Sequence, residues 1–386
     1  SMKEEVLGGC NLLVGKTGGI EPVLFVATGA SFEPSPHPAL TVEHELDSGG
    51  SKSIVWVLAS CRRKEDSFQV SRALMSRAWD AEVARLDLVN SSMVDVETGN
   101  PDWDIALAMA QKVALGCYVG PTSHLPCPSF VLSRVPDRGY SERGDGRDHG
   151  LLWDGQTAAD ACAHLALVLP VAPELAKGVM RNFLAAQAGD GSVDWKPGLA
   201  GQRNGALCQP LLATMSWMIY YHTEDLAFAE EVFPRLVEFV DRWFGPDHDR
   251  DEDGHPEWDH TLHAGYDEWP SFVRWQAWGQ GLDVSTAETP DLASYLYREC
   301  QSLIYLARAV NRLEGIPKLE QRMEILRQSV ELSWSDQDSS YHHRDRDGHV
   351  SYRSEILGRG RGPFTLDVGR GFDPPARILV RMHGPR

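Results

Sequence analysis

Three features that would assign a chain of 386 residues to a familiar class are missing. No apolar run approaches the roughly 20 residues that a membrane-spanning helix needs. The seven cysteines are scattered and form no C-x-x-C pair, so the sequence indicates neither a zinc site nor a disulfide framework. We therefore expect reduced cysteines in a cytoplasmic protein.

Positive charge is also scarce, because 37 basic residues face 55 acidic ones and the net charge is −18. Nucleic-acid binding depends on basic patches that neutralise phosphate, so no nucleic acid is expected, and no anionic membrane either. A neutral ligand such as a sugar suits this charge. The chain is 42 % apolar and 24 % charged, which is typical of a soluble globular protein, and its length predicts two or more domains.

Both ends of the chain have β patterns. Residues 21–29 and 53–61 are rich in β-branched and aromatic residues, and residues 40–61 read as a hairpin with a turn at 47–52. We interpret residues 1–66 as an antiparallel β-sandwich region. Residues 337–386 form a second β segment, which we expect to begin a further domain of a longer protein.

Between these ends the apolar spacing is helical, so residues 67–336 are predicted to be an (α/α) helical-hairpin domain. Helices fit residues 102–119, 157–169, 172–187, 209–222, 225–244, 289–310 and 317–332, and Pro234 is expected to break one of them. Two long loops, 121–155 and 245–288, are rich in Trp, Gly, Asp and Arg, and long loops in compact domains are usually functional. The predicted fold is mainly α, a toroid of paired helices with a site at one end.

The loop "DRDEDGHPEWDH" at residues 249–260 matches the first half of a calcium-binding EF-hand loop. Asp249, Asp251 and Asp253 have the required spacing, and Glu257 falls at the ninth position. The twelfth position holds His260 where the pattern has a glutamate. The alternative is an acidic turn without an ion. A structural Ca²⁺ here would brace the loop and take no part in chemistry, so no cofactor is required.

Two adjacent acids, Asp267 and Glu268, lie between Tyr266 and Trp269. Aromatic neighbours remove water from a carboxylate, which raises its pKa and favours a proton donor. Aromatic faces also stack on sugar rings, so an acid in an aromatic cleft fits the general acid of glycoside hydrolysis. The alternative is an ion pair with Arg274 on a solvated loop.

Two further loops offer sugar ligands. Trp153 and Asp154 directly precede a predicted helix, where Asp154 either caps the helix or binds a sugar hydroxyl beside Trp153. Arg203 lies in the glycine-rich stretch "DWKPGLAGQRNGA" as a candidate hydroxyl ligand. This stretch lacks the spacing of a phosphate-binding loop, so nucleotide binding is not indicated.

Together these motifs resemble a group of glycoside hydrolases: trehalases, processing α-glucosidase I, mannosylglycerate hydrolases and glycogen-debranching-type glucosidases. "HAGYDEWPSF", "DEDGHPEWDH" and "WDGQTAAD" occur in similar order there, and the resemblance covers residues 102–310. It implies an (α/α)6 barrel behind a β-sandwich, and inverting hydrolysis of an α-glycosidic bond in a glucoside-type oligosaccharide or disaccharide. Carried over by position, Asp267 becomes the general acid. The implied sugar-binding residues are Trp153, Asp154, Arg203, Trp258, Glu268 and Trp269.

The chain departs from this group in its later part. Inversion needs a second carboxylate, which the group carries in an aromatic-rich glutamate segment, and no such segment follows Trp334. About eight helices also fit, fewer than the twelve of a closed barrel. We therefore expect a partial barrel that lacks its C-terminal part, with exposed helix faces that associate with another copy or another chain. The alternatives are an inverting disaccharide phosphorylase and a non-catalytic carbohydrate-binding protein.

Overall fold

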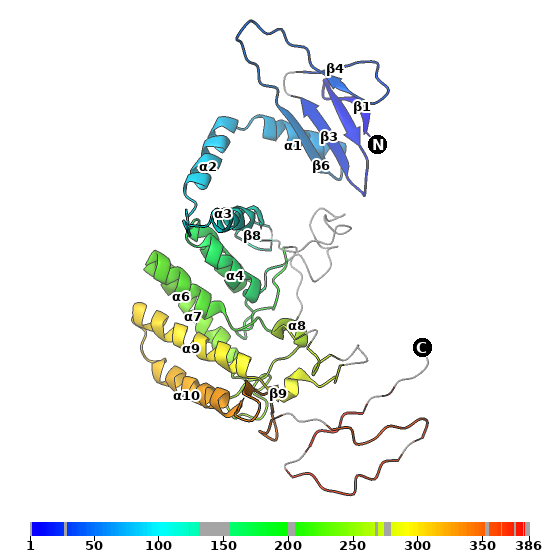
Figure 1. Ribbon diagram of the computed structural model, residues 1–386. Coiled ribbons are helices and arrows are strands. Elements are labelled where there is room, and N and C mark those ends of the chain that lie inside the picture. The colour runs from blue at the N-terminus through cyan, green and yellow to red at the C-terminus, as the bar shows by residue number, and fades with distance from the viewer. Residues whose placement is uncertain are drawn as a thin grey trace. The chain divides into compact units, whose positions relative to one another are not determined.

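The computed structural model describes residues 2–26, 29–122, 124–130, 155–199, 205–266, 269–273, 279–351, 355–363, 365–373, 376–380 and 382 (Figure 1). These residues divide into two compact units, one of residues 2–97 and one of residues 98–130 and 155 onward. None of the helices described is long and apolar enough to cross a membrane. The predicted boundaries at residues 66 and 336 stay a prediction.

The first unit is built on a four-stranded antiparallel sheet. Its order is β1 (Met2–Leu7), β2 (Cys10–Gly15), β3 (Glu21–Val26) and β6 (Trp56–Cys61). Helix α1 (Lys64–Met75) covers one face, where Phe68 is buried with Leu12 and Val23. Helix α2 (Trp79–Ser91) follows. A sandwich needs a second sheet, and the described residues of this unit add only β4 (Ser31–Phe32) paired with β5 (Leu40–Thr41), so the sandwich stays a prediction.

The predicted hairpin over residues 40–61 is wrong. Strand β6 pairs with β3, and the register sets Val57 opposite Phe25 and Ala59 opposite Val23. In this register Val57 and Ala59 are buried, on a strand that packs against α1. Burial of apolar area therefore favours the pairing of β6 with β3, and the turn residues at 47–52 do not determine which strand β6 pairs with.

The second unit is helical, as predicted. Its long helices are α3 (Pro101–Gly116), α4 (Ala158–Val168), α5 (Pro173–Ala185), α6 (Leu212–Thr223), α7 (Leu226–Trp243), α9 (Pro290–Ala309) and α10 (Ile316–Leu332). Each packs on its neighbour in sequence where a short loop joins the two, and alternate helices also meet, α4 with α6, α6 with α9, and α5 with α7. Two layers of alternate helices are the arrangement expected of paired (α/α) hairpins. The prediction of a mainly α fold with strands before and after it is therefore confirmed.

Short elements connect the helices. They are β7 (Tyr118–Val119), β8 (Ser129–Phe130), α8 (Thr261–Ala264), η2 (Val284–Thr286), β9 (Ala287–Glu288), β10 (Trp334–Ser335), β11 (Ser340–Tyr341) and β12 (Arg344–Asp345). Strand β7 pairs with β8, β10 with β11, and β9 with β12. The last pair joins segments that lie on opposite sides of α9 and α10 in sequence.

Pro234 does not break α7, which corrects the predicted interruption. A proline removes one backbone hydrogen bond and crowds the preceding turn. Here the buried stripe of Val232, Leu236 and Phe239 runs on both sides of the proline and keeps the helix on the core. Tertiary packing therefore outweighs the local propensity.

A buried carboxylate ties two helices together. Glu299 lies in the middle of α9, is fully buried, and accepts hydrogen bonds from the backbone amides of Ala213 and Thr214 at 2.8 and 2.7 Å. These amides belong to the first turn of α6, whose own N-cap residue Leu211 makes no side-chain cap. Glu299 thus satisfies donors that a helix leaves unpaired. Burial raises its pKa to about 7, against the opposing effect of these amides.

We predict that Glu299→Ala lowers the free energy of unfolding by roughly 2–4 kcal/mol, because two buried amides lose their acceptor. Glu299→Gln keeps one acceptor oxygen and is the matched control. Since the pKa is higher in the folded state, the unmodified protein should lose stability relative to Glu299→Gln as the pH rises from about 4.5 to 7. Urea denaturation at several pH values measures both effects; a difference between the two proteins that is independent of pH would contradict the assignment.

Candidate active site

Contacts among the described residues join the N-terminal end of α4 to the segment before α6, and α6 to α9. Gln209, just before α6, accepts a hydrogen bond from the amide of Ala159 in the first turn of α4, at 3.0 Å. Trp217 of α6 contacts Tyr305 of α9, while Ala213 binds Glu299, so α6 and α9 run in the same direction. Strand β9 directly precedes α9, and Tyr266, two residues after α8, interacts with Asp291 in the first turn of α9. Helix N-termini offer free amide donors and partial positive charge to whatever binds there.

The loop around the predicted acid is anchored on both sides. The amide of Tyr266 donates to the carbonyl of Thr261 at 2.8 Å, and the amide of Trp269 donates to the carbonyl of Tyr266 at 3.0 Å. The Tyr266 ring stacks on Phe272 with centroids 5.3 Å apart, and Phe272 belongs to the core. Burial, and after it the charge of Asp291, raise the pKa of Tyr266 well above its usual range, so its hydroxyl stays neutral.

Several predicted site residues lie outside the described residues. They are the acid Asp267, its neighbour Glu268, the sugar-binding candidates Trp153, Asp154 and Arg203, and Arg274, the ion-pair alternative. Trp269 is described and its side chain is 50 % exposed beside Tyr266, with ring centroids 5.8 Å apart. About half of the Trp269 side chain is therefore accessible to a ligand.

Trp258 does not fit the sugar-binding role that the resemblance implied. It is 1 % exposed and belongs to the hydrophobic core, where its ring lies edge-on to Trp243 at 5.5 Å. It also contacts Tyr295 of α9. An enclosed indole offers no face to a ligand, so Trp258 anchors the acidic loop in the hydrophobic core instead. The tryptophan in "PEWDH" carries no signal in its own sequence that separates these roles.

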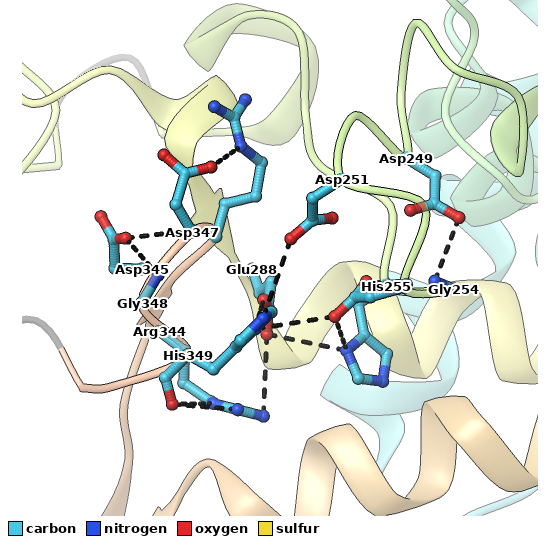
Figure 2. A network of polar contacts seen from close by, with 12 residues as sticks. Asp249, Asp251, Gly254, His255, Glu288, Arg344, Asp345, Asp347, Gly348 and His349 are labelled. Carbon is cyan, nitrogen blue, oxygen red and sulfur yellow. Dashed lines mark hydrogen bonds and ion pairs between the residues drawn. The ribbon is translucent and has the colours of Figure 1, made fainter. Parts of the chain in front are cut away.

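The acidic loop contributes two of its predicted ligands to a group of four potential metal-binding side chains. One donor atom from each of Asp251, Asp253, Glu288 and His349 can be chosen so that all four lie within 4.8 Å of one another (Figure 2). His349 Nδ1 is 2.8 Å from Glu288 Oε1 and 3.6 Å from Asp253 Oδ2. Burial, and after it the charge of Asp253, raise the pKa of Asp251. A cation among these acids would relieve that repulsion.

Sequence reasoning missed Glu288 and His349. Glu288 is the last residue of β9, and His349 follows β12, whose Arg344 pairs with Glu288 in the register of the two strands. The loop pattern at 249–260 contains no hint of either residue. Only the pairing of β9 with β12, which joins distant parts of the chain, brings them to the loop.

The other two predicted ligands, Asp249 and Glu257, are outside this group. Asp249 Oδ2 accepts from the amide of Gly254 at 3.1 Å and closes the turn, where Gly254 has a φ of 89° that favours glycine. Glu257 is fully buried and pairs with Arg250 at 3.0 Å, and burial raises its pKa to about 8. Both thus have structural partners, so the EF-hand ligand order is not reproduced.

The region that contains these loops is similar to a known family. Residues 154–365, more than half of the chain, match the family described as "Mannosylglycerate hydrolase MGH1-like glycoside hydrolase domain". The chain belongs to this family. The family is a glycosidase family, and the matched region contains the whole of the loop at residues 245–288 but only the last two residues of the loop at 121–155. A search of curated proteins found no match.

Three solved structures from Thermus thermophilus are similar to the chain at low identity. A GH63 mannosylglycerate hydrolase in complex with Tris and D-glycerate is 15 % identical, over 64 % of this chain and 69 % of that one, with a TM-score of 0.46. The same enzyme in complex with glucose is 17 % identical, over 52 % of this chain and 62 % of that one, with a TM-score of 0.42. An uncharacterized conserved protein is 14 % identical, over 46 % of this chain and 58 % of that one, with a TM-score of 0.38. The chain therefore spans between 58 and 69 % of the length of these proteins.

Two of the predicted sugar-binding tryptophans, Trp258 and Trp269, are described and give a matched test of the site. Trp258→Ala should lower the free energy of unfolding by roughly 3–5 kcal/mol, because it empties a core position. Trp269→Ala should change it by less than about 1 kcal/mol, because a half-exposed ring contributes little to the fold. Urea denaturation of both variants measures this difference. Equal losses would contradict the placement of Trp258 in the core.

Proposed function

We propose that this chain is the catalytic part of a glycoside hydrolase that cleaves an α-glycosidic bond by inversion, with Asp267 as the general acid. The observation that carries the proposal is the membership of residues 154–365 in a glycoside hydrolase family, since that range includes the loop of Asp267. The aromatic residues on both sides of Asp267 and Glu268 add support, because they are anchored and one of them is open to a ligand.

The loop supplies what a general acid needs. The stacked rings of Tyr266 and Phe272 form an apolar surface, and the Tyr266 hydroxyl in it stays neutral. An apolar surface raises the pKa of a neighbouring carboxyl group, which then keeps its proton nearer to neutral pH. Asp267 would give this proton to the glycosidic oxygen while Trp269 stacks on the sugar. Glu268 serves as an orienting neighbour or a sugar ligand, and Trp153, Asp154 and Arg203 are proposed as further sugar ligands.

Inversion also needs a carboxylate base on the opposite face of the sugar, roughly 6.5–9.5 Å from the acid, with a water between them. Glu268 is a poor candidate because consecutive residues rarely face each other across a substrate. We assign no base in this chain. The substrate class we propose is a glucoside-type disaccharide or oligosaccharide, and the family description adds mannosylglycerate to the compounds that a test should contain.

We predict that Asp267→Asn lowers turnover by about 10²–10⁴-fold, because the leaving oxygen loses its proton donor. Glu268→Gln is the matched control and should reduce turnover far less. NMR-monitored turnover of α-linked glucose disaccharides and mannosylglycerate, with and without phosphate, measures both. Unchanged turnover by Asp267→Asn would contradict the assignment, and turnover only with phosphate would contradict hydrolysis.

We also propose that the acidic loop binds a structural Ca²⁺, held by the carboxylates of Asp251, Asp253 and Glu288. Oxygen ligands from three carboxylates suit a hard cation. Within the described residues, Glu288 Oε2 is buried without a hydrogen-bond partner, and a cation among the carboxylates would compensate it together with Arg344, whose Nη1 lies 3.6 Å away. We do not include His349 among the calcium ligands, because an imidazole nitrogen is a better ligand for transition metals than for calcium.

Millimolar Ca²⁺ should therefore raise the melting temperature, by a binding contribution of about 2–3 kcal/mol at 100 times the dissociation constant. Asp253→Asn should abolish this rise. Glu252→Gln changes an exposed acid of the same loop and should keep it. His349→Ala should keep the response to Ca²⁺; stabilisation by Zn²⁺ alone that is lost in His349→Ala would contradict calcium as the ion.

A further inference from the structure

Three aromatic rings from two distant parts of the chain form one cluster that includes Tyr266, the residue before the predicted acid in sequence. Tyr266 and Phe272 belong to the loop around Asp267, and His343 belongs to the segment between β11 and β12. His343 stacks on Phe272 with centroids 5.2 Å apart and an interplanar angle of 26°. It also contacts the Tyr266 ring at 5.6 Å. Each ring therefore contacts the other two.

The position of His343 is fixed from both sides. Its neighbour His342 donates its amide to the carbonyl of Ser333 at 2.8 Å, at the end of α10. The next residue, Arg344, pairs with Glu288 of β9. Backbone bonds on both sides of His343 thus fix where its imidazole lies. The imidazole is the ring that the segment between β11 and β12 adds to the cluster.

Other contacts also place this loop: the Tyr266 side chain interacts with Asp291 and Thr289 at the start of α9. The amides of Gln280 and Leu282 donate to the carbonyls of Pro270 and Ser271 at 2.7 and 2.9 Å. Tyr266 and Trp269 are joined to each other and to Thr261 by backbone hydrogen bonds, which fix local shape but not the placement of the loop on the helices. Phe272 is 1 % exposed and seats the loop in the core. His343 covers the Phe272 ring and touches Tyr266, the residue that directly precedes Asp267.

We propose that His343 is a positioning residue, whose ring packs on Phe272 and Tyr266 and thereby holds the backbone next to Asp267 in place. The proposal rests on the function proposed above. Stacked and tilted ring pairs add stability beyond that of the area that they bury. Misplacement of a catalytic group by about 1 Å can cost 10²-fold in rate, so a modest loss of packing has a large kinetic effect.

The imidazole acts in this role as a neutral ring. Burial lowers the pKa of His343, against the opposing effect of the Asp291 carboxylate. A phenylalanine can therefore replace the ring without loss of a needed charge. This separates positioning from proton transfer, because a proton-transfer role would not survive that substitution.

The test compares His343→Ala, His343→Phe and the matched control His342→Ala. His342 is the same residue type one position earlier, and it faces Asp338 at 3.1 Å instead of the rings. Two readouts are recorded: amide hydrogen exchange of a peptide covering residues 265–273, and kcat and KM on the substrate identified by the turnover panel.

For His343→Ala we expect faster exchange in this peptide and a fall in kcat of about 10–100-fold with KM changed by less than about threefold. His343→Phe should restore both, and His342→Ala should change neither. Unchanged exchange in His343→Ala, or no rescue by His343→Phe, would overturn the proposal. Should His343→Ala fail to fold, His343→Leu replaces it with a similar volume and no flat ring, and the same result is expected.

The two readouts separate this proposal from the proposed function. If the unmodified protein turns over no glycoside, the proposed function fails, and the exchange result still decides whether His343 holds the loop. If turnover is normal and exchange in His343→Ala is unchanged, only the positioning role fails.

Discussion

The pairing of β9 with β12 is the interaction on which the candidate site depends most. It consists of two residue pairs, Arg344 with Glu288 and Asp345 with Ala287. The amide of Arg346 extends it by donating to the carbonyl of Thr286 at 3.0 Å. The segment after α10 is thereby returned to the place where α9 begins. Without this pairing, neither His343 nor His349 would reach the loops that precede α9.

The pairing serves two groups of residues at once. On one side of β12, His343 packs against the aromatic loop around Asp267; on the other, His349 meets Glu288 and the acids of residues 251–253. The helices beneath supply a fixed support, since Glu299 joins α9 to the start of α6 and Gln209 joins the segment before α6 to the start of α4. Hydrogen bonds from backbone amides to the side chains of Glu299 and Gln209 thus connect the helices whose N-terminal ends follow these loops.

The sequence predicts the helices well because their cores repeat at a local period. Leu296, Cys300, Leu303 and Ala307 mark one face of α9 within a single stretch of chain, and all four are buried. Local signals fail where the deciding contact is distant. Strand β6 pairs with β3 and not with residues 40–46, which are nearer in sequence. Helix α7 continues through Pro234 because buried residues on both sides of the proline pack in the core.

The same distinction explains the site. The spacing of Asp251 and Asp253 is visible in one loop, whereas Glu288 and His349 join them only through tertiary pairing. Trp258 and Trp269 are similar in sequence context, yet one lies in the core and the other is half exposed. No periodicity separates two tryptophans in an irregular loop, because the burial of Trp258 depends on Trp243 and Tyr295, which come from α7 and α9.

The central claim, inverting hydrolysis of an α-glycosidic bond, is tested most directly by the anomeric form of the first sugar released. Proton NMR spectra recorded within the first minutes of the reaction distinguish the α and β anomers before they equilibrate. Inversion predicts that the β anomer appears first from an α-linked substrate. Release of the α anomer first would mean retention, and it would contradict a mechanism in which water attacks opposite Asp267.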